Sequence, residues 1–574
     1  MFLFIEQSEE MKQANEVLNG IGMNRKSHFW IFFIMLVLMS LFIAFIYGPA
    51  YDHPGYDYYF HLKRFEALIT ALREGNFPIY IDYSAALNYG YLSKMFYSDI
   101  VLVPFALLGL FMDASVAYEV MLFTMTILCG VFMYKAINNI YKNSFAAFIG
   151  AILYTFSVYR LFDIYNRGAL GEVFAFTFVP IVFLGLYHII KGDYKKWYII
   201  TIGFSLLIFS HVISTVLTFI TVVILLIVYY KPLIKDPKRI SYLIFAGIIT
   251  LLITATYILP MWEQMQSNVF RYESNDWTLP SRTKLSFDYL LWALSCGFIY
   301  PKDITIVGIG VLLTLAIFMR FLVKEKSDKL KSVDIGVLIG IFYIIASSFI
   351  FPWGRFPFTL LSFIQYPSRL YLFVTFFFSI AGGYYLSRIF LKDKQRFVVA
   401  FVILLLVGAT MYFHSNNYKY MYGEHIRESN EKPVPGNFFY LNGAEYVPEK
   451  VSSGYYVQNR GDSIISINGK TEIKAYNRDK NILSINVSAH GIDSLELPLF
   501  YYKGYYAAAN KTEIVISQSD NGLIQIPITE SGNVKVYYKG TLIQKISWYV
   551  SIISIFALSI YIFVMIRKQK RSKI

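Results

Sequence analysis

The sequence predicts a polytopic α-helical membrane protein with an extracytoplasmic β-sandwich just before its last membrane segment. Three observations support this fold class. Of the 574 residues, 56% are hydrophobic and only 16% are charged, which is more apolar surface than a soluble globular chain needs. Apolar runs of membrane-spanning length recur through most of the chain, and short alternating runs replace them near the C-terminus.

The net charge of +14 raises the question of nucleic-acid binding. The lysines and arginines, however, concentrate in short segments between apolar runs, as the cytoplasmic loops of membrane proteins do. We therefore expect the lipid bilayer as a partner and no nucleic acid. Cys129 and Cys296 lie in or beside apolar runs without metal-ligand spacing, so the sequence predicts neither a disulfide framework nor a metal site.

Arg25 and Lys26 precede the first apolar run, which places segment 1–28 in the cytoplasm and the following loop outside. Segment 1–28 lacks the pattern of a cleaved signal peptide, and translation could start at Met1 or Met23. About twelve crossings are expected. They cover 29–47, 116–134, 145–160, 173–190, 197–212, 213–230, 240–260, 304–323, 333–351, 369–389, 397–414 and 546–566.

Because the crossings alternate in direction, each loop that follows an even-numbered crossing lies inside the cell. Lys142, Lys238 and the other basic residues of these loops are therefore cytoplasmic. The run 99–112 is about half the spanning length, so we expect a surface or re-entrant helix there. The transmembrane domain is expected over 29–414, with its first outer loop at 48–115. Both termini are then cytoplasmic in a multi-pass protein of the cell membrane.

Region 415–545 reads differently, because runs of alternating apolar and polar residues are separated by turn-forming residues. This pattern predicts a β-sandwich outside the cell. The final crossing and a basic cytoplasmic tail occupy 546–574. The alternating runs are 453–460, 462–470, 471–480, 481–489, 512–520, 522–529 and 532–540.

The first outer loop contains an amphipathic helix that begins near Asp57, after Pro54 and Gly55 break the chain. Asp57, His61 and Arg64 are spaced at i, i+4 and i+7, so they share one helix face. A carboxylate and a cation at the membrane surface could act as a base and an anion clamp. In the alternative interpretation, Asp57 only caps the helix and the other two side chains are solvated.

Four segments carry a family resemblance: GYDYYFHLKRFEALITALREGNFP (55–78), YTFSVYRLFDIYNRGALGE (154–172), FIQYPSRLYLF (363–373) and LPLFYYKGYYAAANKTEI (497–514). They resemble the YfhO-type bacterial membrane proteins, which overlap a family labelled 6-pyruvoyl-tetrahydropterin synthase-related. The surface helices in the first outer loop, the many crossings and the late β domain resemble the GT-C superfamily of membrane glycosyltransferases.

The resemblance implies the attachment of sugars to cell-envelope polymers such as teichoic acids. It also implies an essential acidic residue in the first outer loop, for which Asp57 and Asp52 are the matching positions. Many GT-C enzymes have two adjacent acids there, whereas HPGY separates these two. Whether both act, and whether a divalent cation is needed, therefore stays open, and the sequence specifies no cofactor.

An extracytoplasmic transfer has no nucleotide-sugar pool, so a polyprenyl-phosphate sugar is the expected donor. It requires cations at headgroup depth and a base for the acceptor hydroxyl. Arg369, just after Gln365, is the foremost phosphate candidate, since a guanidinium binds phosphate in bidentate fashion; it could instead be an interface anchor. Arg355, beside Trp353, is a further candidate cation.

Arg167 and Glu172 lie in NRGALGE, a turn into a crossing, where they could form an ion pair that fixes the turn or belong to the site. His211 lies near the outer end of a crossing, where it could bind substrate or simply pack through hydrogen bonds. The complete set of expected site residues is Asp52, Asp57, His61, Arg64, Arg167, Glu172, His211, Arg355, Gln365 and Arg369.

The sequence thus favours a membrane glycosyltransferase that transfers a sugar from a polyprenyl-phosphate donor to a cell-envelope acceptor. Two other functions are open: a transporter or flippase of a lipid-linked sugar, and a non-catalytic scaffold whose β domain binds envelope polymer. Broken helices with midplane charges would favour the transporter. Protein partners, the sugar and the acceptor are not specified by the residues.

Overall fold

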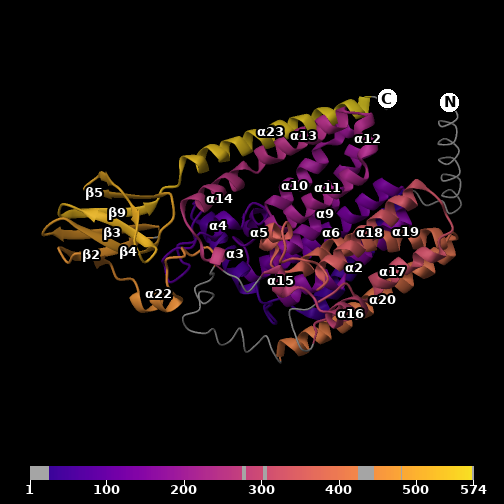
Figure 1. Ribbon diagram of the computed structural model, residues 1–574, viewed down its shortest axis with the longest axis horizontal. Coiled ribbons are helices and arrows are strands. Elements are labelled where there is room, and N and C mark those ends of the chain that lie inside the picture. The colour runs from indigo at the N-terminus through magenta and orange to yellow at the C-terminus, as the bar shows by residue number, and fades with distance from the viewer. Residues whose placement is uncertain (1–24, 275–278, 301–306, 424–444, 480, 572–574) are drawn as a thin grey trace.

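The computed structural model describes residues 25–274, 279–300, 307–423, 445–479 and 481–571. Most of segment 1–28 and part of the expected 304–323 crossing lie outside the described residues. The described chain is mostly helical, with strands confined to the C-terminal part, as predicted (Figure 1).

Seven of the described helices are long and apolar enough to cross a membrane. The number rises to nine if each of two bent helix pairs forms one crossing. The seven segments are Ser27–Tyr47 in α2, Ala114–Tyr141 (α6), Leu170–Ile190 (α9), Asp328–Ser347 (α18), Pro367–Ile389 with α19, Asp393–Met421 (α20) and Leu542–Lys568 in α23.

The expected number of about twelve crossings stays a prediction, because three of the expected segments form shorter helices. The segments 197–212 and 213–230 contain α10 (Tyr198–Ile208) and α11 (Val212–Val228), of 11 and 17 residues. The described part of 304–323 forms α17 (Gly310–Phe318) and a 3₁₀ turn. These helices are apolar, but they fall short of the roughly 20 residues that a bilayer core requires.

Two helix pairs are bent. The chain turns by 40° between α7 (Ser144–Thr155) and the segment Val158–Arg167, and by 69° between α13 (Lys238–Ile253) and α14 (Ala255–Ser267). Segment Val158–Arg167 consists of α8 (Val158–Leu161) and the π-helix Phe162–Arg167. A π-helix inserts a bulge into a helix and occurs frequently at functional sites.

The remaining helices have 16 residues or fewer. The segment 48–115, expected as the first outer loop, contains α3 (Tyr58–Arg73), which matches the expected amphipathic helix. The segment 99–112 contains only the six-residue helix α5 (Val103–Leu108). The others are α4 (Ser93–Phe96), α12 (Tyr230–Lys235), α15 (Pro280–Thr283), α16 (Phe287–Ser295) and α22 (Gly454–Arg460).

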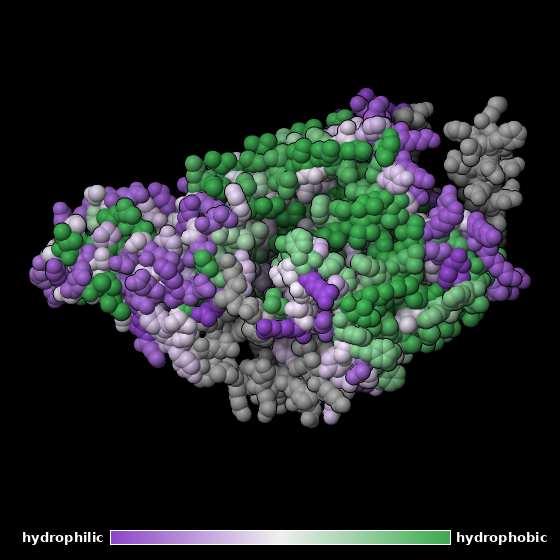
Figure 2. All heavy atoms as spheres, viewed as in Figure 1, coloured by the Kyte–Doolittle hydropathy of each residue, from purple (hydrophilic) through white to green (hydrophobic). Residues whose placement is uncertain are grey.

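The helical core centres on α19 (Tyr371–Ile389), which packs against α7, α17 and α18. The most apolar stretch of this helix is entirely buried inside the protein. In α23 (Leu542–Arg571), only 11% of the most apolar stretch is buried. Apolar residues also cover the outside of the helices in a broad band (Figure 2). Lipid contact explains this exposed apolar surface, since water would not tolerate it.

In the described part of the chain, nine strands form two antiparallel sheets. One sheet has the order β1-β4-β8-β7 and the other β2-β3-β9-β5-β6. Alternate residues of β3, β4, β8 and β9 build one shared apolar core. The strands are β1 (Ile465–Ser466), β2 (Thr471–Asp479), β3 (Ile482–Ala489), β4 (Asp493–Phe500), β5 (Tyr505–Ala509), β6 (Thr512–Ile514), β7 (Ser517–Gln518), β8 (Leu523–Ile528) and β9 (Gly532–Tyr538).

The run 453–460 was expected to form a strand, and this expectation is wrong, because it forms helix α22. The Ser453 side chain accepts a hydrogen bond from the amide of Tyr456, and Gly461 follows the helix with φ +59°. Serine before and glycine after a helix are common end signals, and here they override the alternating pattern.

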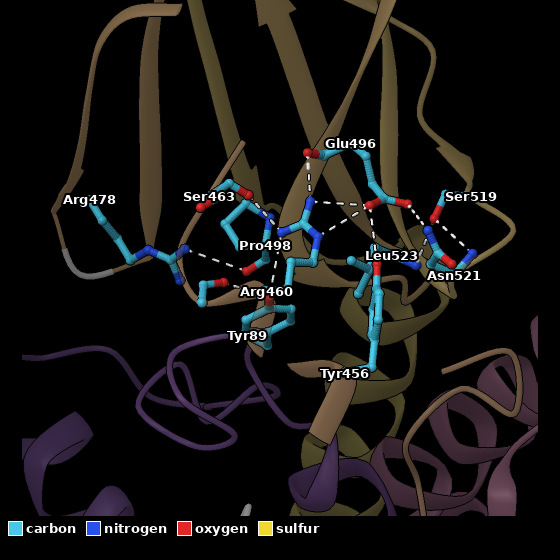
Figure 3. A network of polar contacts seen from close by, with 11 residues as sticks. Tyr89, Tyr456, Arg460, Ser463, Arg478, Glu496, Pro498, Ser519, Asn521 and Leu523 are labelled. Atoms are coloured by element: carbon cyan, nitrogen blue, oxygen red, sulfur yellow. Dashed lines mark hydrogen bonds and ion pairs between the residues drawn. The ribbon is translucent and has the colours of Figure 1, made fainter. Parts of the chain in front are cut away.

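The β strands are joined to the loop around Tyr89 by a buried polar network centred on Arg460 (Figure 3). Its guanidinium lies 3.2 Å from Glu496 of β4, and both side chains are at most 4% exposed. Tyr89 of the loop donates a hydrogen bond of 2.6 Å to the carbonyl of Gly461. An apolar cluster shared by 81–96 and the β region extends this contact, so the loop and the strands form one packed unit.

Candidate functional site

The start of α3 and the π-helix lie against each other through backbone. The amides of Tyr56 and Asp57 donate hydrogen bonds of 3.3 and 2.7 Å to the carbonyls of Asn166 and Arg167. A Cβ on Gly55 would lie 2.6 Å from the carbonyl oxygen of Tyr165, so only glycine allows this approach. Two segments that are 110 residues apart in sequence therefore meet here.

Asp57 occupies the residue before α3, but its side chain makes no capping hydrogen bond. Its Oδ2 instead lies 3.6 Å from Nε of Arg167. The Asp57 side chain is 45% exposed and that of Arg167 is 21% exposed. The capping interpretation therefore fails in geometry, and Asp57 is an accessible carboxylate at the edge of a basic site.

Glu172, at the first turn of α9, lies on the other side of Arg167 and is almost fully buried. Its Oε2 is 3.2 Å from Nη1 of Arg167 and 3.7 Å from Nε of Arg369. Its Oε1 accepts a hydrogen bond of 2.7 Å from the hydroxyl of Tyr159. A single buried carboxylate thus holds both guanidinium groups in place.

Arg369 is 5% exposed and is held from its own segment as well. Its Nη1 donates hydrogen bonds of 2.7 Å to the carbonyl of Ile364 and 3.0 Å to Oε1 of Gln365. The ring of Tyr366 lies 5.7 and 5.6 Å from the guanidinium carbons of Arg167 and Arg369. Gln365 has φ +64°, a strained conformation of the kind that persists at functional sites.

His61 and Arg64 are buried, at 5% and 7% exposure, so they are not solvated as the alternative interpretation expected. The Arg64 guanidinium lies 5.4 Å from the Tyr97 ring and its Nε 3.4 Å from Oδ1 of Asp99. Burial, with the nearby charge of Arg64, lowers the pKa of His61 well below its usual value. His61 is therefore neutral at pH 7 and able to donate or accept a hydrogen bond.

His211 precedes α11, and its Nδ1 accepts a hydrogen bond of 3.3 Å from the amide of Ser214. Its ring lies next to Gly171, and its charged neighbours are Arg369 and Arg167. His211 thus borders the site and also performs a structural task, because it caps a helix.

Two expected residues are not brought into this cluster. Arg355 is exposed, and no ion pair of it appears among the described residues. Asp52 is exposed as well, and it lies near His53 and Glu119.

Sequence reasoning overlooked Asp163 and Asn166 of the π-helix. Both are at most 1% exposed, and no polar atom of either side chain has a hydrogen-bond partner among the described residues. The charged neighbours of Asp163 are Glu172, Arg167, Arg369 and Arg160. Asp163 could have been identified as an ionisable residue within a membrane segment. Such residues cost free energy to bury and are commonly functional.

A metal centre was not expected and divalent-cation dependence was left open. Within the described ranges, no group of three or more histidine, cysteine, aspartate or glutamate side chains is arranged to hold a metal ion. The positive charges at the site are those of Arg167 and Arg369, and guanidinium groups suit anionic ligands such as phosphate.

Comparison with known proteins gives one family match. The model of the bacterial membrane protein YfhO matches residues 65–428, which is more than half of the chain. This chain belongs to the YfhO family. The matched range includes Arg167, Glu172, Gln365 and Arg369. It begins within α3, eight residues after Asp57, and ends before the strands.

A relative from Lactococcus lactis subsp. cremoris (strain MG1363), described as an uncharacterized protein, is 21% identical over 346 residues. The aligned part is 58% of this chain and 55% of the relative, so this YfhO-family chain spans about half of that protein's length. The predicted resemblance to YfhO proteins is confirmed, and of the four sequence segments only 497–514 lies wholly outside the matched residues.

Proposed function

We propose that this YfhO-family protein is a GT-C-like glycosyltransferase with about twelve crossings and an outer β-sandwich. It transfers a sugar from a polyprenyl-phosphate donor to an extracytoplasmic acceptor such as a teichoic acid. The observation that carries the proposal is the exposed Asp57 carboxylate, 3.6 Å from Arg167 in a site that also holds the buried Arg369. A base next to fixed guanidinium groups suits an acceptor hydroxyl and a phosphate leaving group.

In the proposed reaction, Asp57 takes the proton of the acceptor hydroxyl as that oxygen attacks the anomeric carbon. The bond from this carbon to the lipid-phosphate oxygen breaks, and its electron pair stays on the phosphate. Arg167 and Arg369 neutralise the departing phosphate, and Glu172 keeps both side chains oriented. A single displacement inverts the anomeric centre.

The polar surface supports an outer location for this site. In Figures 1 and 2, hydrophilic residues gather over the strands and again near α12 and the end of α23, with the apolar band between them. Lys235 and Arg567 lie at the second polar end, as the positive-inside rule requires for a cytoplasmic face. The strands and the Asp57 site then face outward.

Asp57→Asn tests the proposal. An amide cannot take the acceptor proton, so the transfer rate should fall by about 10² to 10⁴. Stability should change little, because the side chain is 45% exposed and makes no cap bond. The rate is measured with purified protein, a radiolabelled polyprenyl-phosphate sugar and a deacylated polymer acceptor.

Asp52→Asn is the matched control, since Asp52 is an exposed carboxylate outside the cluster. It should retain near-normal activity. If Asp57→Asn is active and Asp52→Asn is inactive, the base is Asp52. If both variants transfer sugar normally, the proposed enzyme lacks its base and the reaction assignment is wrong.

A second candidate function is the transport of a lipid-linked sugar. The observation that favours it is the 40° break after α7, which leads into α8 with Arg160 and the π-helix with Asp163, both fully buried. The same purified protein in vesicles separates the two functions. A transporter moves the labelled lipid across the bilayer without any acceptor, whereas a transferase consumes the donor only when the acceptor is present.

A further inference from the structure

The outward face of the five-stranded sheet carries a row of lysine and tyrosine along β9 (Gly532–Tyr538) and the residue that follows it. Lys535, Tyr537 and Lys539 alternate with buried residues, so all three side chains point away from the sheet core. Successive members are about 7 Å apart along an extended strand. Lys535 and Lys539 are exposed, and neither ammonium is ion-paired within the described ranges.

Tyr506 of β5 widens this row into a platform. It is the cross-strand partner of Tyr537, and the two ring centroids are 5.3 Å apart. The ammonium of Lys539 lies 4.5 Å from the centre of the Tyr506 ring. We call Tyr506, Lys535, Tyr537 and Lys539 the β9 face; it offers two adjacent half-exposed rings with a cation on either side.

A groove of about 300 Å³ continues the β9 face toward the last helix. Tyr506 and Lys539 line it together with Glu513, Thr541 and Lys545. Because β9 ends at Tyr538 and α23 begins at Leu542, the groove lies where the strands meet the last membrane segment. Strand β9 and helix α23 both run along the long axis of the molecule in Figure 1, so the β9 face extends away from the membrane.

We propose that the β9 face binds a sugar-bearing phosphodiester polymer. Flat aromatic rings pack against the C–H face of a pyranose, ammonium groups attract phosphates, and the Glu513 carboxylate can accept sugar hydroxyl bonds. A row that extends away from the membrane fits an extended chain better than a bilayer plane. The inference rests on the proposed function, because the polymer is the class of acceptor named there.

The test uses the full chain in phosphatidylcholine nanodiscs without donor. The probe is deacylated, glycosylated poly(glycerol phosphate), and its dissociation constant is measured by calorimetry. The double variant Tyr506→Ala/Lys539→Glu should bind at least about tenfold more weakly, since a stacking contact and a cation are both lost. Tyr506→Phe, which keeps the ring, should bind as the unmodified protein does.

The matched control is Lys474→Glu/Tyr476→Ala, which changes the same residue types at exposed positions of the edge strand β2, which β3 separates from β9. Its affinity should stay within about twofold of the unmodified protein, a difference well below 1 kcal/mol. Thermal unfolding of both double variants should match that of the unmodified protein. If the double variant unfolds early, Lys535→Glu, on the exposed side chain alone, takes its place and should still weaken binding.

Three results would overturn the inference. The first is equal affinity of the unmodified protein and Tyr506→Ala/Lys539→Glu for the polymer. The second is equal binding of inorganic polyphosphate, which would make the face a site for charge alone. The third is binding to phosphatidylglycerol vesicles with none to the deacylated polymer, which would make it a membrane contact. Failure of the proposed reaction appears separately, as an active Asp57→Asn enzyme with polymer binding unchanged.

Discussion

The two carboxylates on either side of Arg167 differ in their surroundings and therefore in their expected roles. Asp57 is 45% exposed, whereas Glu172 is 1% exposed and faces two guanidinium groups. An accessible carboxylate can meet an acceptor hydroxyl, and a buried one stabilises the arrangement of the cations. Within one site, Asp57 is therefore expected to take part in the reaction, and Glu172 to position the arginines.

This difference predicts that Glu172→Gln destabilises the protein. The amide keeps the shape but leaves Arg167 and Arg369 without their shared counter-charge, at a cost of about 3 kcal/mol. Thermal unfolding in detergent should show a clear loss for Glu172→Gln and almost none for Asp57→Asn. Equal unfolding temperatures for Glu172→Gln and the unmodified protein would mean that Glu172 does not hold the two arginines.

At the scale of elements, the site depends on the contact of the α3 start with the π-helix. Gly55→Ala should separate them, since the new Cβ would lie 2.6 Å from the Tyr165 carbonyl oxygen. We expect activity to fall at least about tenfold through displacement of Asp57 from Arg167. Gly247→Ala is the control, because its Cβ would have no neighbour within 4 Å. Its activity should be unchanged, and a fully active Gly55→Ala would contradict the argument.

The stability of the β region depends on the charge of Asp493, whose carboxylate accepts hydrogen bonds from the loop between β1 and β2. Although burial raises the pKa of Asp493, hydrogen bonds from Ser466 and from the amides of Asn468 and Ser494 outweigh it and lower the pKa well below the usual value. A lowered folded-state pKa stabilises the fold above the unfolded pKa of about 4, and this stabilisation is lost as pH falls further.

We therefore expect the β region to lose stability below about pH 4, and Asp493→Asn to reduce that pH dependence while lowering stability at pH 7. Hydrogen exchange of the β1–β2 segment in the full chain, between pH 3 and 7, measures both effects. An Asp493→Asn protein with the same pH profile as the unmodified one would show that this carboxylate does not contribute.

At the scale of the whole molecule, the apolar band and the two polar ends predict sidedness. Reporters fused after Lys142 or Lys238 should behave as cytoplasmic, and one near Gly461 should behave as exported. Alkaline phosphatase and green fluorescent protein fusions measure this directly. A cytoplasmic result near Gly461 would move the strands and the Asp57 site to the inner face, where the argument for a lipid-linked donor no longer holds.

The sequence by itself determined the membrane class, the surface helix near Asp57, the late strands and the family, because hydropathy and periodicity are local properties. It also named Asp57, Arg167, Glu172, Gln365 and Arg369 separately. Their meeting was decided by the tertiary structure, since it depends on the backbone contact between 55–57 and 165–167 and on the packing of α19.

Tertiary structure also decided what spacing could not. It buried His61 and Arg64, excluded Arg355 and Asp52 from the cluster, and brought in Asp163, which the sequence had not singled out as a site residue. Burial of a charge depends on which distant elements cover it, and that information is absent from a periodic pattern. The same reason explains why 453–460 forms a helix and not a strand. Ser453 and Gly461 are helix-end signals, and the helix is held by contacts with Tyr89 and Glu496 that the alternating pattern does not reveal.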